Sequence, residues 1–115
     1  MVNILIAEDE ARIATFIAKG LRKAGYTTQI ATNGYEAINL AAQCDLMLLD
    51  IGLPGVDGWA VLKELGAKAS DVPVIVVTAL DNAEERDLSL ALGADDFVSK
   101  PFRFEQLLAC IRRHV

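Results

Sequence analysis

The chain has 115 residues, enough for one domain with a substantial hydrophobic core. A hydrophobic fraction of 53% and a charged fraction of 23% exclude a disordered segment. The net charge of −5 argues against direct binding of this segment to nucleic acid, and no apolar run approaches the roughly 20 residues of a membrane span.

The first half of the chain predicts two strands and two helices. Residues 2–7 form an apolar run typical of a buried strand, and residues 26–31 predict a second strand. Between them, residues 11–24 predict a helix that ends before Gly25. Its apolar stripe consists of Ile13, Phe16, Ile17, Leu21 and Ala24. Thr32 or Asn33 could cap a short helix that contains Ala37, Ile38 and Ala41.

The second half repeats the pattern three times. Strands are predicted at residues 45–50, 74–78 and 96–100, and the β-branched run 74–78 is the clearest of them. Asp57 could cap a helix over residues 58–68, and a further helix is predicted over residues 81–92. The final helix carries Leu107, Leu108 and Ile111 on one face.

Apolar strands that alternate with amphipathic helices predict an α/β fold with a parallel sheet covered on both faces. Five strands joined by right-handed crossovers favour the doubly wound order 2-1-3-4-5 of flavodoxin-like folds. Repeats and internal linkers are absent from the sequence, so we expect a single domain over residues 1–115.

Polar residues stand where four of these strands end. Glu8 and Asp9 follow the first strand, Asp50 ends the third, Thr78 ends the fourth and Lys100 ends the fifth. Because parallel strands share one carboxyl edge, we expect these five side chains to lie together. Ligands of open α/β sheets bind at this edge, so the sequence predicts a functional site there.

The acids of this set predict a magnesium site. Glu8, Asp9 and Asp50 offer only oxygen ligands, which suit Mg²⁺, and the backbone carbonyl of Gly52 could add another. The set contains no cysteine or histidine, so zinc is not expected at this edge. The alternative is that Glu8 and Asp9 merely cap the following helix.

Asp50 is also a candidate nucleophile, because carboxylates accept phosphoryl groups as acyl phosphates. Lys100 could neutralise one phosphoryl oxygen, and the Thr78 hydroxyl could donate to another. Leu80 and Gly52 flank the site and are expected to influence water access. Taken singly, the three polar residues have structural alternatives as a capping aspartate, a strand threonine and a surface lysine.

Almost the whole chain resembles the receiver domain of two-component response regulators, in the branch that carries a winged-helix DNA-binding domain (the OmpR type). The resemblance rests on ILIAEDE at residues 4–10, LLDIGLPGVDG at 48–58, VTA at 77–79 and GADDFVSKPF at 93–102.

The resemblance implies that Asp50 accepts phosphate from a phosphohistidine on a sensor histidine kinase, with Mg²⁺ as cofactor. It also implies that the domain is a signalling switch with self-catalysed phosphotransfer and dephosphorylation, and not an enzyme acting on other substrates. Thr78 and Phe97 match the two switch positions of the family. Simple core packing is the alternative role for Phe97.

The output face of this branch lies on the fourth helix, the fifth strand and the fifth helix, where members often form homodimers. The matching positions here are Arg86, Asp95 and Asp96. Gln106 stands where the family usually has an acid, and Cys110 stands where it usually has a base. The usual symmetric dimer is therefore in question.

Leucines on the predicted helix 81–92 point in several directions, so they cannot all face one core. We expect Leu88, at a position where the family is usually polar, or Leu92 to lie on an exposed contact surface. Scattered surface leucines are the alternative.

Three other classes of function fit the sequence less well. A hydrolase with an aspartyl-phosphate intermediate often has a second aspartate two positions after the nucleophile, but Gly52 stands there. A flavodoxin-type binding domain needs a phosphate loop, and Glu8 and Asp9 occupy its place. A receiver that works only as an interaction module would not need the complete set of acids, threonine and lysine.

No signal peptide is evident, and Cys44 and Cys110 match no metal spacing, so we expect reduced packing thiols and a cytoplasmic location. The chain ends shortly after Arg112 and Arg113, where receivers usually continue. We expect a C-terminal effector domain outside this segment that makes any contact with DNA. A stand-alone receiver is the alternative.

Overall fold

Five parallel strands form one sheet in the order β2-β1-β3-β4-β5, in a computed structural model that describes residues 1–68, 71–79 and 83–115. The predicted fold and strand order are therefore confirmed. The strands are β1 (Asn3–Ala7), β2 (Thr27–Ala31), β3 (Leu46–Leu49), β4 (Val74–Thr78) and β5 (Asp96–Ser99).

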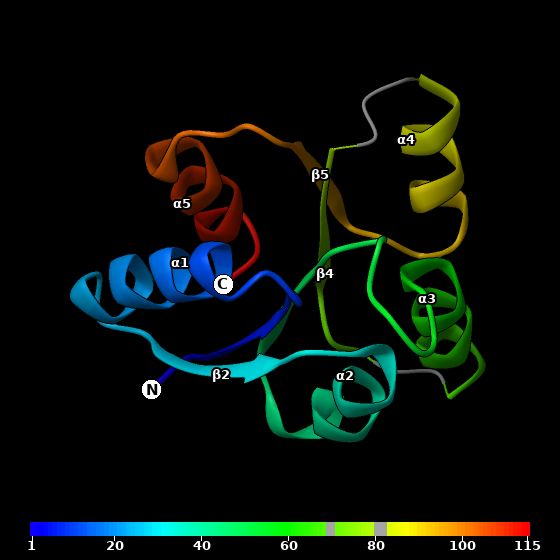
Figure 1. Ribbon diagram of the computed structural model, residues 1–115, viewed down its shortest axis with the longest axis horizontal. Coiled ribbons are helices and arrows are strands. Elements are labelled where there is room, and N and C mark those ends of the chain that lie inside the picture. The colour runs from blue at the N-terminus through cyan, green and yellow to red at the C-terminus, as the bar shows by residue number, and fades with distance from the viewer. Residues whose placement is uncertain (69–70, 80–82) are drawn as a thin grey trace.

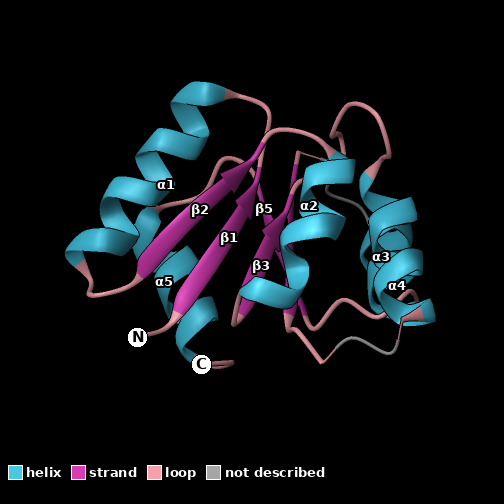
Figure 2. Ribbon diagram, turned by 90° about the horizontal axis from the view of Figure 1, so that it is seen from below, coloured by secondary structure: helices cyan, strands magenta, loops and turns pink. Residues whose placement is uncertain are grey.

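Helices cover both faces of the sheet (Figure 1). Figures 1 and 2 show α1 and α5 on one face, and α2, α3 and α4 on the other. The helices are α1 (Ala11–Lys23), α2 (Gly34–Leu40), α3 (Gly58–Ala67), α4 (Ala83–Ala91) and α5 (Phe104–Arg112), with a 3₁₀ turn, η1 (Ala41–Gln43), after α2.

The two faces of the sheet produce two hydrophobic clusters. Leu5 and Ala7 of β1 join the cluster beneath α2 and α3, whereas Ile4 and Ile6 join the cluster beneath α1 and α5. Successive strand residues point to opposite faces, and both faces are covered here. This arrangement explains why the central strands appear in the sequence as continuous apolar runs.

The buried stripe of α1 differs from the prediction. Phe16 is 52% exposed, and the buried residues are Ala14, Ile17, Ala18 and Leu21. These four residues follow the i, i+3, i+4, i+7 spacing of one helix face, and two of them are alanines with small side chains. The Phe16 ring packs edge-on against Phe104, with 6.0 Å between ring centroids.

Helix α4 buries a serine instead of a leucine. Ser89 is fully buried and satisfies its hydroxyl by donating to the Glu85 carbonyl at 2.9 Å. Leu88 and Leu90 are 45% and 46% exposed, whereas Leu92 packs partly against the core. Of the two leucines expected at a contact surface, Leu88 is thus the exposed one. Asp81, the predicted helix start, lies outside the described residues.

Two predicted helix caps are present. The side chains of Asn33 and Asp57 accept from the backbone N–H groups of Glu36 and Ala60, both at 2.9 Å. Each satisfies a donor that the first helical turn leaves unpaired. Cys44 and Cys110 are both free and buried, as predicted. No helix among the described residues is long and apolar enough to cross a membrane.

Candidate functional site

The carboxyl edge of the sheet brings together Glu8, Asp50 and Lys100. Each of them directly follows the last residue of a strand. The Asp50 N–H donates to the Ala7 carbonyl at 3.0 Å, which places Asp50 beside Glu8. The Lys100 N–H donates to the Thr78 carbonyl at 2.8 Å. Backbone pairing thus continues past the strand ends and fixes the positions of the polar residues.

The side chains of this edge meet around the Lys100 ammonium group. Lys100 Nζ lies 2.7 Å from Glu8 Oε1 and 3.3 Å from Asp50 Oδ2. Glu8 and Asp50 are buried, whereas Asp9 is exposed at the rim. The ammonium group therefore compensates the negative charge of two carboxylates that have little exposure to solvent.

The three acids fit a hard divalent cation. One carboxylate oxygen from each of Glu8, Asp9 and Asp50 lies within 4.8 Å of the others. Oxygen-only donors with an exposed member suit Mg²⁺, which retains several water ligands. The capping alternative receives little support: the N-cap of α1 is Glu10, and Glu8 accepts only a 3.4 Å contact from the Glu10 N–H.

Burial and neighbouring charges shift the pKa values of Glu8 and Lys100. Burial, followed by the neighbouring Asp50, raises the pKa of Glu8 to about 7, although Lys100 opposes the shift. Burial alone would lower the pKa of Lys100, but its contacts with Glu8 and Asp50 raise it above the ordinary value. Lys100 therefore stays cationic, and the Glu8 carboxyl group is protonated more readily than that of an ordinary glutamate.

We expect Glu8→Gln to stabilise the domain at pH 8 without divalent cations. The folded pKa of Glu8 lies above the unfolded value, so ionisation increasingly favours the unfolded chain between about pH 4.5 and pH 7. Glutamine does not ionise, so above pH 7 the free energy of unfolding of the variant should exceed that of the wild-type chain by about 1–3 kcal/mol. Thermal unfolding at pH 4 and pH 8 checks it: the gain should vanish at pH 4. A variant equally or less stable at pH 8 would contradict the electrostatic account.

The Asp50 carboxylate is fixed from two sides. Its Oδ1 accepts from the Gly52 N–H at 3.0 Å, and its Oδ2 faces Lys100. The following loop packs closely, because a Cβ on Gly58 would collide with the Ile51 backbone. A Cβ on Gly52 would meet only Asp50 Oδ1, at 3.7 Å, so space alone does not require glycine there. Leu80, expected to flank the site, lies outside the described residues.

The two expected switch residues lie on neighbouring strands. Thr78 is 3% exposed at the end of β4, and Phe97 lies in β5, where it pairs with Val76. Phe97 is half-buried, packs against the core and carries the Arg86 guanidinium 5.4 Å from its ring centroid. The ring is thus held between the core on one side and a cation on the other.

The remaining residues of the expected output face make contacts within the chain. Asp95 accepts from the Val74 N–H at 2.8 Å, and the Gln106 side chain accepts from the Arg103 N–H at 2.9 Å at the start of α5. Cys110 is buried. Gln106 therefore has a local role that an acid could also fill.

Asp96 has two partners that the sequence did not reveal. Its Oδ2 lies 2.9 Å from Arg113 Nη2 and 3.1 Å from His114 Nε2. Although partial burial would raise the pKa of Asp96, hydrogen bonding with Cys110, Phe97, Arg113 and His114 holds it well below its usual range. The i, i+4 spacing of Cys110 and His114 was the available signal for this cluster.

Comparisons with known proteins agree with this geometry. The sequence model of the response regulator receiver domain matches residues 4–112. The probable transcriptional regulatory protein SilR of Salmonella typhimurium is 42% identical over 113 residues, which cover 96% of this chain and 50% of SilR. The chain spans about half the length of the curated relatives it matches.

Two solved receiver domains superpose closely on the chain. The receiver domain of Francisella response regulator 1452 has a TM-score of 0.93 and 32% identity, covering 98% of this chain and 95% of that one. The BeF3-activated N-terminal receiver domain of Klebsiella pneumoniae RstA has a TM-score of 0.91 and 34% identity, covering 97% of both chains.

Proposed function

Because this chain belongs to the response regulator receiver domain family, we propose that it is a phosphoaccepting switch in which Asp50 receives the phosphoryl group. The observation that carries the proposal is the contact of Lys100 with both Glu8 and Asp50 at the carboxyl edge of the sheet. A half-buried cation beside a fixed carboxylate supplies the charge neutralisation that phosphoryl transfer requires.

Asp50 attacks the phosphorus atom of a phosphohistidine on a sensor histidine kinase. A bond forms between an Asp50 carboxylate oxygen and phosphorus, the phosphorus–nitrogen bond breaks, and the imidazole leaves with the electron pair and takes up a proton. The Lys100 ammonium group leaves its carboxylate partners and pairs with a phosphoryl oxygen. The Thr78 hydroxyl donates to another phosphoryl oxygen.

Glu8, Asp9, Asp50 and the Gly52 carbonyl would hold Mg²⁺. When bound, this ion supplies neutralisation of negative charge on the phosphoryl group. The same residues permit self-catalysed dephosphorylation, in which water attacks phosphorus, the bond from phosphorus to the Asp50 oxygen breaks, and the proton of the water passes to solvent. The domain is in this account a switch that catalyses only its own modification.

The phosphoryl group acts as a signal through Thr78 and Phe97. It adds about 1.5 to 2 negative charges and several strong acceptors at Asp50. Movement of Thr78 towards these acceptors vacates space behind β4, and Phe97 turns inward from the Arg86 side. The signal reaches α4, β5 and α5, and from there a DNA-binding domain outside this segment.

Acetyl phosphate, a small phosphoryl donor, tests the proposal. With Mg²⁺, intact-mass measurement should find one phosphoryl adduct per chain, and a chelator should suppress it because the acids then lack their cation. Absence of an adduct at every Mg²⁺ concentration would leave a pure interaction module as the better account.

We also expect Leu88→Glu to weaken self-association or partner binding of the phosphorylated domain, because Leu88 is 45% exposed on α4. Loss of one buried leucine contact corresponds to about a tenfold or larger rise in the dissociation constant. Sedimentation with and without phosphorylation measures it. Leu90→Glu, at an equally exposed leucine of the same helix, shows whether the effect is particular to position 88. Unchanged mass and unchanged partner binding in Leu88→Glu would show that Leu88 is not a contact residue.

A further inference from the structure

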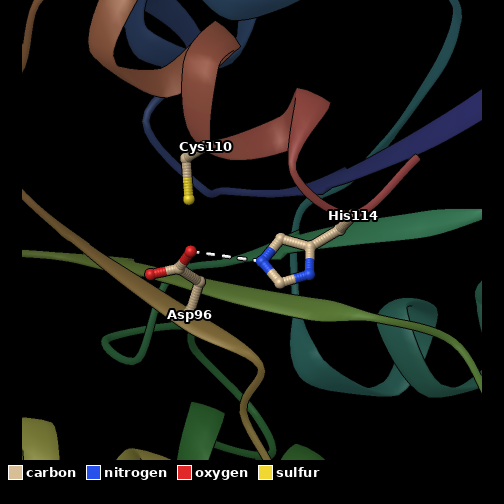
Figure 3. A group of neighbouring side chains, drawn as sticks. All are labelled: Asp96, Cys110 and His114. Atoms are coloured by element: carbon tan, nitrogen blue, oxygen red, sulfur yellow. Dashed lines mark hydrogen bonds and ion pairs between the residues drawn. The ribbon is translucent and has the colours of Figure 1, made fainter.

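We propose that Asp96, Cys110 and His114 form a second metal site, which binds Zn²⁺ or a similar transition-metal ion. Figure 3 shows the three side chains pointing towards one another from β5, α5 and the turn that follows α5. The site is separate from the acid cluster, with which it shares no residue.

The geometry brings three different donor atoms to one point. The Cys110 sulfur, a His114 ring nitrogen and an Asp96 carboxylate oxygen all lie within 4.8 Å of one another. Ligands of a tetrahedral zinc ion at about 2.0–2.3 Å stand roughly 3.5 Å apart. The His114–Asp96 separation is already 3.1 Å, so small side-chain rotations suffice.

The local backbone holds these donors in place. Cys110 and His114 are four residues apart, and the His114 N–H donates to the Ile111 carbonyl at 2.9 Å, which continues the turn beyond α5. Asp96 is anchored on β5, where its own Oδ1 accepts from the Phe97 N–H at 2.9 Å. One donor on α5 and one on the turn that follows it, opposite a strand carboxylate, make a preorganised arrangement.

The donor set selects a transition metal over magnesium. Thiolate and imidazole are poor ligands for Mg²⁺ and good ligands for Zn²⁺. A thiolate, a carboxylate and a neutral imidazole together carry two negative charges, which balance a divalent ion. Three protein ligands leave a fourth position for water or for a donor from another chain.

Metal binding exchanges a proton for the ion. Burial, followed by the neighbouring Asp96 carboxylate, raises the pKa of the Cys110 thiol to about 11, so the thiol is protonated without metal. When Zn²⁺ binds, the S–H bond breaks, a Zn–S bond forms and the proton leaves to water. If Nε2 is the ligand atom, its proton moves through water to Nδ1, and its hydrogen bond with Asp96 is lost as the Zn–N bond forms.

A pocket gives the ion a path to the buried sulfur. It has a volume of about 500 Å³ and is lined by residues that include Cys110, Phe97, Gln106 and Arg113. Arg113 competes for Asp96 Oδ2, but its side chain is 64% exposed and free to rotate towards solvent. The cost of displacing it is therefore small, as for other exposed ion pairs.

Cobalt and zinc titrations of the 115-residue chain test the proposal. Co²⁺ is expected to produce a thiolate-to-metal charge-transfer band at one equivalent, which Zn²⁺ removes and excess Mg²⁺ does not. Cys110→Ser should abolish the band, and His114→Gln should weaken affinity by more than the roughly 10- to 100-fold that loss of an outer partner costs. Cys44→Ser, at the other buried cysteine, is the matched control and should retain the band.

Three results would overturn the proposal: no band in the wild-type chain, a band that survives in Cys110→Ser, or unchanged affinity in His114→Gln. Circular dichroism establishes that each variant is folded. His114 is half-buried in the turn after α5, outside the two hydrophobic clusters, so His114→Gln provides a decisive result even if Cys110→Ser fails to fold. Phosphorylation of Asp50 is measured separately, which distinguishes a failure of this site from a failure of the switch.

Discussion

An Asp50→Asn variant is expected to form no phosphoryl adduct with acetyl phosphate and Mg²⁺, although it should fold normally. The amide is nearly isosteric with the carboxylate, and its oxygen can still accept from the Gly52 N–H. It lacks the negative charge that makes the carboxylate a nucleophile and metal ligand. Lys100 loses one of its two carboxylate partners in this variant. It keeps its 2.7 Å contact with Glu8, so its positive charge remains paired. Intact-mass measurement compares the variant with the wild-type chain.

Asp57→Asn is the matched control for that experiment. Asp57 is exposed and caps α3 by accepting from the Ala60 N–H at 2.9 Å, a role that asparagine also performs. It should retain a full adduct. An adduct of wild-type size in Asp50→Asn, located by peptide mapping to another residue, would contradict Asp50 as the acceptor.

A Lys100→Ala variant is expected to be phosphorylated roughly 10²- to 10³-fold more slowly, because one charge that stabilises the transferring group is removed. It should also lose about 2–4 kcal/mol of stability at pH 8, because Glu8 and Asp50 remain buried without their cation. The loss should be smaller at pH 5, where Glu8 is protonated and less charge needs compensation. Quenched reactions analysed by intact mass measure the phosphorylation rate. Chemical unfolding at pH 5 and pH 8 measures the stability.

Lys68→Ala distinguishes a site effect from a general effect of losing a lysine. Lys68, directly after α3, pairs with Glu64 of that helix at 3.7 Å, and both side chains are about half exposed. Such pairs contribute about 0–1 kcal/mol, so this control should change neither rate nor stability appreciably. Mg²⁺ should restore part of the stability of Lys100→Ala, since it supplies the missing positive charge. Wild-type kinetics in Lys100→Ala would remove Lys100 from the proposed chemistry.

The fold was predictable from sequence because it rests on two strong periodic signals. Residues 74–78 were predicted as a strand with the bounds that the structure has, and the other strand bounds differ by one residue at each end at most. Helix faces were less predictable where small residues do the packing. In α1, Ala14 and Ala18 are buried while Phe16 is half exposed, and in α4 the buried residue is Ser89. Hydrophobicity does not distinguish a small buried side chain from a small exposed one.

The candidate site divides in the same way. The positions of Glu8, Asp50 and Lys100 directly after β1, β3 and β5 were sufficient to predict that these three side chains meet, because parallel strands share one carboxyl edge. The sequence could not predict that Glu8 makes the shorter contact with Lys100, or that this buried carboxyl has its pKa raised to about 7. Those properties depend on distances and burial that arise only when the helices close over the sheet.

The strand order, the composition of the acidic edge and the family of the chain can all be read from the amino-acid sequence alone. Which charges compensate one another, and which side chains surround Cys110, became known only from the folded arrangement. Cys110 was expected to be a packing thiol, and it is buried, but β5 brings Asp96 to its sulfur and the turn after α5 brings His114. Periodicity specifies which face of an element is buried, whereas contacts between elements depend on how they cross, and crossing is fixed by packing of the whole core.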